Sequence, residues 1–98
     1  MKKRNKECNI IRCDERQDDF NVYKYELTMR RGNETASFRL PLYSIKVSMT
    51  DIYGSTGERT LCDAFSDTEK ALRFYERIVE NLATPIDLAY VWEDDAVV

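Results

Sequence analysis

Histidine is missing from this chain of 98 residues, so the sequence offers no imidazole for acid–base catalysis or for metal binding. Cysteine is scarce: Cys8, Cys13 and Cys62 are an odd number with no Cys-x-x-Cys pair, which favours free thiols over a disulfide framework. Every apolar run falls far short of the roughly 20 residues that a helix needs to cross a bilayer. The sequence therefore assigns no catalytic residue, no cofactor and no metal ligand.

Length and charge favour one small globular domain. A chain of this length can bury about 65% of its unfolded surface and can fold without disulfides or metals. The formal net charge of -3 is unevenly distributed, with basic residues at the start and acidic residues at the end: Lys2, Lys3, Arg4 and Lys6, then Asp87, Glu93, Asp94 and Asp95. An acidic protein is a poor nonspecific binder of nucleic acid, because such binding depends on Lys and Arg contacting phosphates.

The start of the chain also bears on location and domain organisation. Polar residues follow the basic start, so no signal peptide is recognised and we expect a cytoplasmic protein. Residues 1–19 are assigned to an N-terminal segment whose order the sequence leaves open. Residues 20–98 are assigned to a single α+β domain.

Alternating apolar residues predict strands in the first two thirds of the chain. Residues 20–29 alternate, and one face carries Tyr23, Tyr25, Leu27 and Met29. The pair Gly32-Asn33 predicts a tight hairpin turn, after which residues 36–42 return antiparallel. A change of face beside Pro41 predicts a bulge or a break before residues 43–49. The two glycines within residues 51–57 predict a turn, and a further strand is expected at residues 58–65.

Two capping patterns predict helices in the last third of the chain. Residues 66–69 form a capping box with Ser66 as the N-cap, and a helix over residues 67–82 follows it. The apolar residues of this helix recur at steps of three and four: Ala71, Leu72, Tyr75, Ile78, Val79 and Leu82. Pro85 ends the helix, and Thr84 with Asp87 predicts the start of a second, short helix, with a further strand at residues 88–92 as the alternative.

Together these elements predict the α+β class. We expect an antiparallel sheet of about three to five strands packed against one amphipathic helix, with a short C-terminal helix.

The segments Tyr43-Ser44-Ile45-Lys46-Val47 and Pro85-x-x-Leu88-x-x-Val91-x-Glu93-Asp94 resemble a small bacterial family, domain of unknown function 6514. The resemblance covers residues 20–94. It departs from the family pattern at Ser44, where Gly is usual, and at Asp87, where His is frequent. The resemblance implies a bacterial cytoplasmic protein in which strands, an amphipathic helix and a segment beginning with proline follow one another. It implies no activity, and the departure at Asp87 removes the one imidazole that the pattern offers.

Three short features can carry chemistry, and each has a simpler interpretation. The spacing Cys8-x4-Cys13 suggests a zinc site or a redox pair, but a zinc site needs two further ligands. We interpret Cys8 and Cys13 as bystanders and Cys62 as a small core residue. The glycines within residues 51–57 can cradle a phosphate, but a strand rather than a helix follows them, as in a hairpin turn. The acidic residues 93–95 can bind a divalent cation, whereas a solvated helix end is the simpler interpretation.

Tyr90 and Trp92 are the predicted partner contacts, together with the adjacent Glu93 and Asp94. Tyr and Trp are frequent anchors of protein interfaces, although both rings can instead complete the core. We therefore favour a non-catalytic interaction or regulatory module, which forms a homodimer or binds an unknown protein partner through this surface or through an exposed sheet edge. The alternatives are a thiol- or carboxylate-dependent enzyme and a weak nucleic-acid binder that uses the basic N-terminus. We do not expect an enzyme or a membrane protein.

Overall fold

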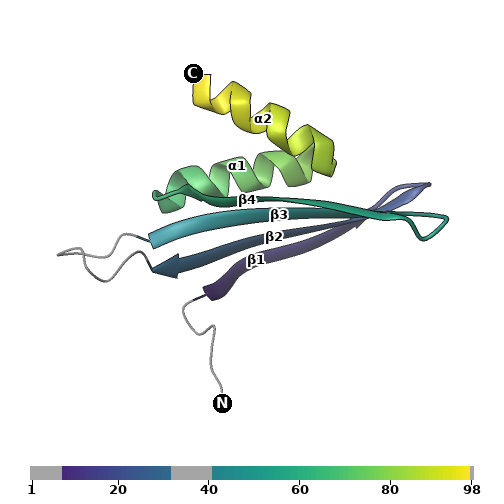
Figure 1. Ribbon diagram of the computed structural model, residues 1–98, viewed down its shortest axis with the longest axis horizontal. Coiled ribbons are helices and arrows are strands. Elements are labelled where there is room, and N and C mark those ends of the chain that lie inside the picture. Colours follow the sequence, from purple (N-terminus) through teal and green to yellow (C-terminus); the bar gives the residue numbers. More distant parts are fainter. Residues whose placement is uncertain (1–7, 32–40, 98) are drawn as a thin grey trace, which may run out of the picture.

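The structure, a computed structural model, describes residues 8–31 and 41–97 of the chain. Four strands come first, β1 (Cys8–Gln17), β2 (Asn21–Arg31), β3 (Pro41–Asp51) and β4 (Thr56–Phe65), and two helices follow, α1 (Thr68–Glu80) and α2 (Pro85–Val97). The strands form one antiparallel sheet in the order β1-β2-β3-β4. Both helices lie on the same face of this sheet (Figure 1). The predicted α+β fold is confirmed.

The core lies between the sheet and the helices. Strands β2 and β3 bury alternate side chains, as a sheet with one covered face requires: Tyr23, Tyr25, Leu27, Tyr43, Ile45 and Val47. The helices and the connection between them meet these strands with their own buried residues, Ala71, Phe74, Tyr75, Ile78, Val79, Ala83 and Leu88. Burial of these apolar side chains is the main stabilising contribution to such a fold. The predicted covered faces of residues 20–29 and 43–49 are thus confirmed.

Helix α1 begins one residue later than the capping pattern predicted. Asp67, rather than Ser66, is the N-cap: its backbone is extended, and its carboxylate accepts a hydrogen bond from the Glu69 N–H at 2.9 Å. Both residue types are good N-caps, so the pattern alone did not discriminate between neighbouring candidates.

Helix α2 begins as predicted. The Thr84 hydroxyl accepts a hydrogen bond from the Asp87 N–H at 3.1 Å, and the Asp87 carboxylate accepts one from the Thr84 N–H at 3.2 Å. This reciprocal cap satisfies two donors at the helix start. The alternative of a strand over residues 88–92 is therefore wrong.

Strand β1 was not predicted from the sequence. It pairs with β2 from Cys8 opposite Arg30 to Gln17 opposite Val22, with a bulge between Ile10 and Arg12. Its alternating positions Arg12, Asp14 and Arg16 are charged, so they lack the apolar period of a half-buried strand.

The loops carry two further outcomes. The predicted turn at residues 32–33 and most of the predicted strand 36–42 lie outside the described residues; β3 begins at Pro41 and pairs with β2 without a register shift. The segment between β3 and β4 is a hairpin turn, as predicted, in which Gly54 has a φ of 88°. No helix within the described residues is both long and apolar enough to span a membrane.

Candidate protein-interaction surfaces

Two hairpin turns lie side by side at one end of the sheet. The first joins β1 to β2, the second joins β3 to β4, and the pairing of Asn21 with Asp51 brings them together. Figure 1 shows both turns at the same end of the strands, opposite the end where β1 starts.

Asp18 fixes the first turn. Its Oδ1 accepts hydrogen bonds from the N–H groups of Phe20 at 2.9 Å and Asn21 at 2.8 Å, and its Oδ2 accepts one from the Tyr23 hydroxyl at 2.7 Å. The hydrogen bond from Tyr23, followed by those from the two backbone N–H groups, lowers the pKa of Asp18. The carboxylate is thus committed to holding the turn, which argues against a role as a proton donor.

Asp51 fixes the second turn in the same way. Its Oδ1 accepts hydrogen bonds from the N–H groups of Tyr53 at 2.9 Å and Ser55 at 3.0 Å. Short side chains with an oxygen acceptor often close turns by binding the backbone two or more residues ahead. Both turns are therefore held rigidly by their own carboxylates.

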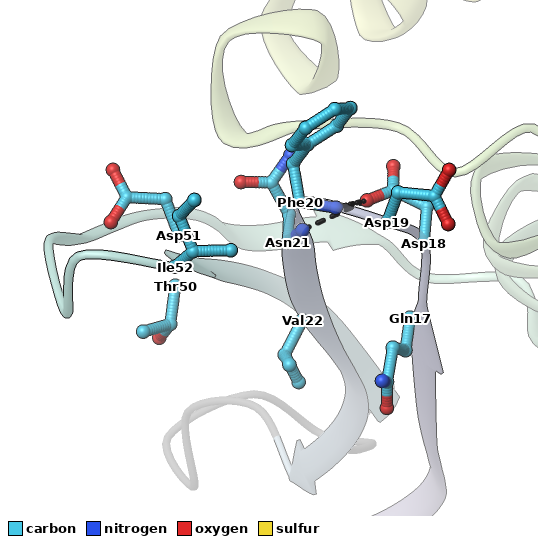
Figure 2. Close-up of a pocket in the computed structure, with 9 residues that line it drawn as sticks. All are labelled: Gln17, Asp18, Asp19, Phe20, Asn21, Val22, Thr50, Asp51 and Ile52. Atoms are coloured by element: carbon cyan, nitrogen blue, oxygen red, sulfur yellow. Dashed lines mark hydrogen bonds between the residues drawn. The ribbon is translucent and has the colours of Figure 1, made fainter.

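A shallow depression of about 110 Å³ lies between the two turns. Its lining residues are Gln17, Asp18, Asp19, Phe20, Asn21, Val22, Thr50, Asp51 and Ile52 (Figure 2). Pockets that enclose a small-molecule substrate usually measure about 300 Å³ or more, so this depression is too small for such a ligand. Its three carboxylates face no Lys or Arg among the lining residues, so its surface is acidic.

Large exposed apolar side chains lie on both turns, and two of them, Phe20 and Ile52, line the depression. Phe20 is 64% exposed, Ile52 62% and Tyr53 87%. In Figure 2 the Phe20 ring points away from the side chains of Val22 and Gln17, toward the side of the hairpin that faces the helices. We call Phe20, Ile52 and Tyr53 the hairpin surface. Sequence reasoning assigned Phe20 to a strand; its place between Asp19 and Asn21, both frequent in turns, was the signal that pointed to a loop.

The predicted contact residues on α2 have different environments. Tyr90 is exposed on the outer side of the helix, four residues after the exposed Ile86. Trp92 is half-buried and packs edge-on against Phe65, with ring centroids 5.2 Å apart, so it completes the core. The side chains of Glu93 and Asp94 lie outside the part that the structure describes.

The thiols are not gathered into a site. Cys13 and Cys62 are exposed free thiols on opposite edge strands, β1 and β4. The expectation that Cys62 is a core residue is wrong: Leu61 lies opposite Ile45 on the helix side, so the next residue points to the uncovered face. In the described segments no three Cys, Asp or Glu side chains are grouped to hold a metal ion.

Two buried tyrosines serve the core. The Tyr25 hydroxyl donates to the Ala83 carbonyl at 2.9 Å, and the Tyr75 hydroxyl reaches Asp14 Oδ2 at 2.8 Å and the Tyr25 carbonyl at 3.1 Å. Burial raises the pKa of Tyr25 to about 12, and burial followed by the hydrogen bond to Asp14 raises that of Tyr75. Both hydroxyls are neutral donors that tie the helices to the sheet, and neither is open to a substrate.

The sheet face away from the helices is polar. Along β2 and β3 it carries mostly charged and hydroxyl side chains, and Glu26 lies opposite Lys46, which forms an ion pair with Glu58 at 3.5 Å. Sheets that bind single-stranded RNA on one face use aromatic side chains to stack the bases. The described strands place no aromatic residue on this face, so it is a poor platform for nucleic acid.

The fold and these surfaces define a two-layer α+β domain with helices on one sheet face and a polar face on the other. The chain belongs to the Family of unknown function (DUF6514), whose model matches residues 4–96. The resemblance found in the sequence is therefore confirmed over nearly the whole chain. Neither the curated proteins nor the solved structures gave a match.

Proposed function

We propose that this protein is a non-catalytic protein-interaction module of the bacterial cytoplasm and that the hairpin surface contacts its partner. The observation that carries the proposal is the exposure of Phe20, Ile52 and Tyr53 on two adjacent turns. Exposed apolar clusters on a small domain mark interaction sites, and burial of one such side chain contributes roughly 1.5–3 kcal/mol.

The rigidity of both turns supports this role. Asp18 and Asp51 each hold two backbone N–H groups, so Phe20 and Tyr53 are presented on fixed backbones. A surface that is already ordered loses less conformational entropy when a partner binds.

The charge around the depression indicates the chemistry of the partner. Asp18, Asp19 and Asp51 line it without a basic residue. Charge complementarity therefore favours a partner segment in which Lys or Arg flanks apolar anchors, and such contacts weaken as salt is added.

A catalytic role receives less support. The depression is smaller than a substrate pocket, and its Asp18 and Asp51 carboxylates are bound to backbone N–H groups. The exposed thiols of Cys13 and Cys62 suit a reducing compartment such as the cytoplasm.

Affinity capture with matched variants tests the proposal. The tagged protein is expressed in bacterial cells, and captured proteins are quantified by mass spectrometry for wild type, for Phe20→Ser/Ile52→Ser/Tyr53→Ser, and for Ile86→Ser/Tyr90→Ser on the outer side of α2. All replaced side chains are exposed, so circular dichroism is expected to show an unchanged fold.

The expected result is a partner that the triple variant loses and the α2 variant keeps. Loss with the α2 variant alone would move the contact to Ile86 and Tyr90. Equal capture by all three proteins would contradict the hairpin surface.

A further inference from the structure

We infer that strand β1 pairs with β1 of a second copy of this chain, in an antiparallel dimer with Cys13 at the two-fold axis. β1 lies at one edge of the described sheet, so one of its sides has no strand partner there. An edge strand presents unpaired N–H and C=O groups that a second strand can bind. The inference is independent of the hairpin surface, because it rests on a different strand and a different set of contacts.

The hydrogen-bond pattern of β1 identifies the groups that face outward. The Asp18 N–H donates to the Asn21 carbonyl at 3.0 Å, and the pairing with β2 is regular from Arg12 to Gln17. Antiparallel pairs alternate between hydrogen-bonded and non-hydrogen-bonded positions. Counting back from Asp18, the N–H and C=O groups of Cys13 and Glu15 therefore point away from β2. When Cys13 of a second β1 lies opposite Cys13 of the first, the outward N–H and C=O groups of the two Cys13 residues form a hydrogen-bonded pair at the two-fold axis.

This register is complementary in charge. With Cys13 opposite Cys13, Arg12 of each copy lies opposite Asp14 of the other, on the helix side of the sheet. Opposite charges at directly facing positions stabilise a pair of strands, and the two-fold axis makes the contact twice. Arg12 and Asp14 have side chains that are 40% and 20% exposed, so both can approach a second strand. Within one copy Arg12 forms ion pairs with Glu76 at 3.3 Å and with Asp14 at 3.6 Å and lies over the Tyr75 ring. Asp14 also forms an ion pair with Arg16 at 3.8 Å and accepts the Tyr75 hydrogen bond. The facing charges of a second copy would join this existing group of ion pairs.

Neighbouring registers each set like charges face to face. A two-fold axis at Asp14 sets that carboxylate opposite itself and Arg12 opposite Arg16. An axis at Glu15 brings Asp14 opposite Arg16 and Arg12 opposite Asp18, but it sets two Glu15 carboxylates together at the axis. Like charges at facing positions are destabilising. In the Cys13 register the regular part of the strand supplies Arg12, Cys13 and Asp14 of both copies, and Glu15 lies opposite Ile11, within the bulge between Ile10 and Arg12.

The other edge strand is less suited to such a pairing. Two-fold axes at Glu58, Arg59 or Thr60 of β4 bring no positive side chain opposite a negative one, and an axis at Leu61 does so only by setting Arg59 opposite Asp63. Asp63 also interrupts β4, with a φ of 50° within an irregular stretch of the pairing with β3. The structure thus favours β1 over β4 as the dimer edge.

The first experiment combines solution mass with thiol cross-linking. Light scattering on the reduced protein, up to about 1 mM, detects a dimer with a dissociation constant of that order or tighter. A short bismaleimide is then added to Cys8→Ser/Cys62→Ser, which keeps only Cys13. The matched control is Cys8→Ser/Cys13→Ser, which keeps only the exposed Cys62 on the opposite edge. We expect a concentration-dependent dimer that cross-links through Cys13 and not through Cys62.

The second experiment changes the edge itself. Glu15→Pro removes an outward N–H and is compatible with an edge strand, so it is expected to leave the monomer folded and abolish the dimer. Arg12→Asp is expected to raise the dissociation constant at least about tenfold, because it sets like charges face to face. Arg12→Asp combined with Asp14→Arg restores facing charges, so this variant is expected to pair with itself and not with wild type.

Each remaining outcome contradicts the inference. A monomer throughout the concentration series, cross-linking through Cys62 as efficient as through Cys13, or a dimer insensitive to Arg12→Asp would each exclude β1 pairing. If Glu15→Pro fails to fold, the Cys13 cross-link and the charge exchange still decide the question.

Discussion

Alkaline titration tests the hydrogen bond between the buried Tyr25 hydroxyl and the Ala83 carbonyl, which lie 2.9 Å apart. Burial raises the pKa of Tyr25 from 10.0 to about 12. The unfolded chain therefore releases this proton near pH 10, whereas the folded chain retains it until about pH 12. Because the folded-state pKa is the higher one, the stabilisation is fully present below pH 10 and is lost as the pH rises toward 12.

The magnitude follows from this shift. Between pH 10 and 12 one retained proton lowers the free energy of unfolding by about 1.4 kcal/mol per pH unit, or about 2–3 kcal/mol in total. Tyr25→Phe removes this part of the pH dependence, and it costs about 1 kcal/mol at neutral pH because the buried hydrogen bond is lost. Tyr75 keeps its own contribution in both proteins, since its pKa is also raised by burial.

Urea unfolding followed by circular dichroism at pH 8, 10, 11 and 12 measures these differences. Tyr53→Phe is the matched control, because Tyr53 is 87% exposed and its replacement is expected to leave the curve unchanged. If Tyr25→Phe loses stability between pH 10 and 12 as steeply as wild type does, the buried hydroxyl does not set the alkaline limit and the reasoning is wrong.

Three further predictions concern single residues. Asp18→Asn is expected to make the free energy of unfolding less sensitive to acid. The pKa of Asp18 is lowered in the folded state, so its contribution to stability is present above pH 3.8 and is lost as the pH falls through the folded-state pKa. Acid unfolding of wild type and variant measures this difference. Gly54→Ala is expected to lower the free energy of unfolding by about 1 kcal/mol, because φ is 88° at this position. Gly57→Ala is the matched control, since its added Cβ meets open space and its φ is not positive. Thermal unfolding is expected to show a loss of stability for the first variant and little change for the second. Thr84→Ala removes the N-cap of α2 and is expected to cost about 1 kcal/mol by chemical denaturation.

The sequence predicted the elements whose local signals agree with their packing. Strand β2 alternates apolar and polar residues because one face is buried, and the start of α2 is encoded locally by Thr84, Pro85 and Asp87. The N-cap of α1 was displaced by one residue because Ser66 and Asp67 are equally suited to that position. Local chemistry was sufficient where it offered one solution and insufficient where it offered two.

The surfaces were harder to predict because exposure depends on the whole fold. Tyr90 and Trp92 are two residues apart on one helix, yet α2 directs Trp92 toward Phe65 and leaves Tyr90 exposed. Phe20 and Ile52 are more than thirty residues apart in the sequence, and the pairing of β2 with β3 brings their turns together. Only the strand register shows that they share one surface.

Strand β1 was missed for a reason that also bears on its proposed pairing. Its helix-facing positions are charged, and they are accepted there because the Tyr75 hydroxyl binds Asp14 and Glu76 binds Arg12. Charges on an edge strand usually discourage pairing with foreign strands. Here Arg12 and Asp14 stand on either side of Cys13, so they are mismatched with most strands and matched with an antiparallel copy of themselves. The charged residues that deprive β1 of an apolar periodicity are thus the same residues that make its edge selective for a second copy of β1.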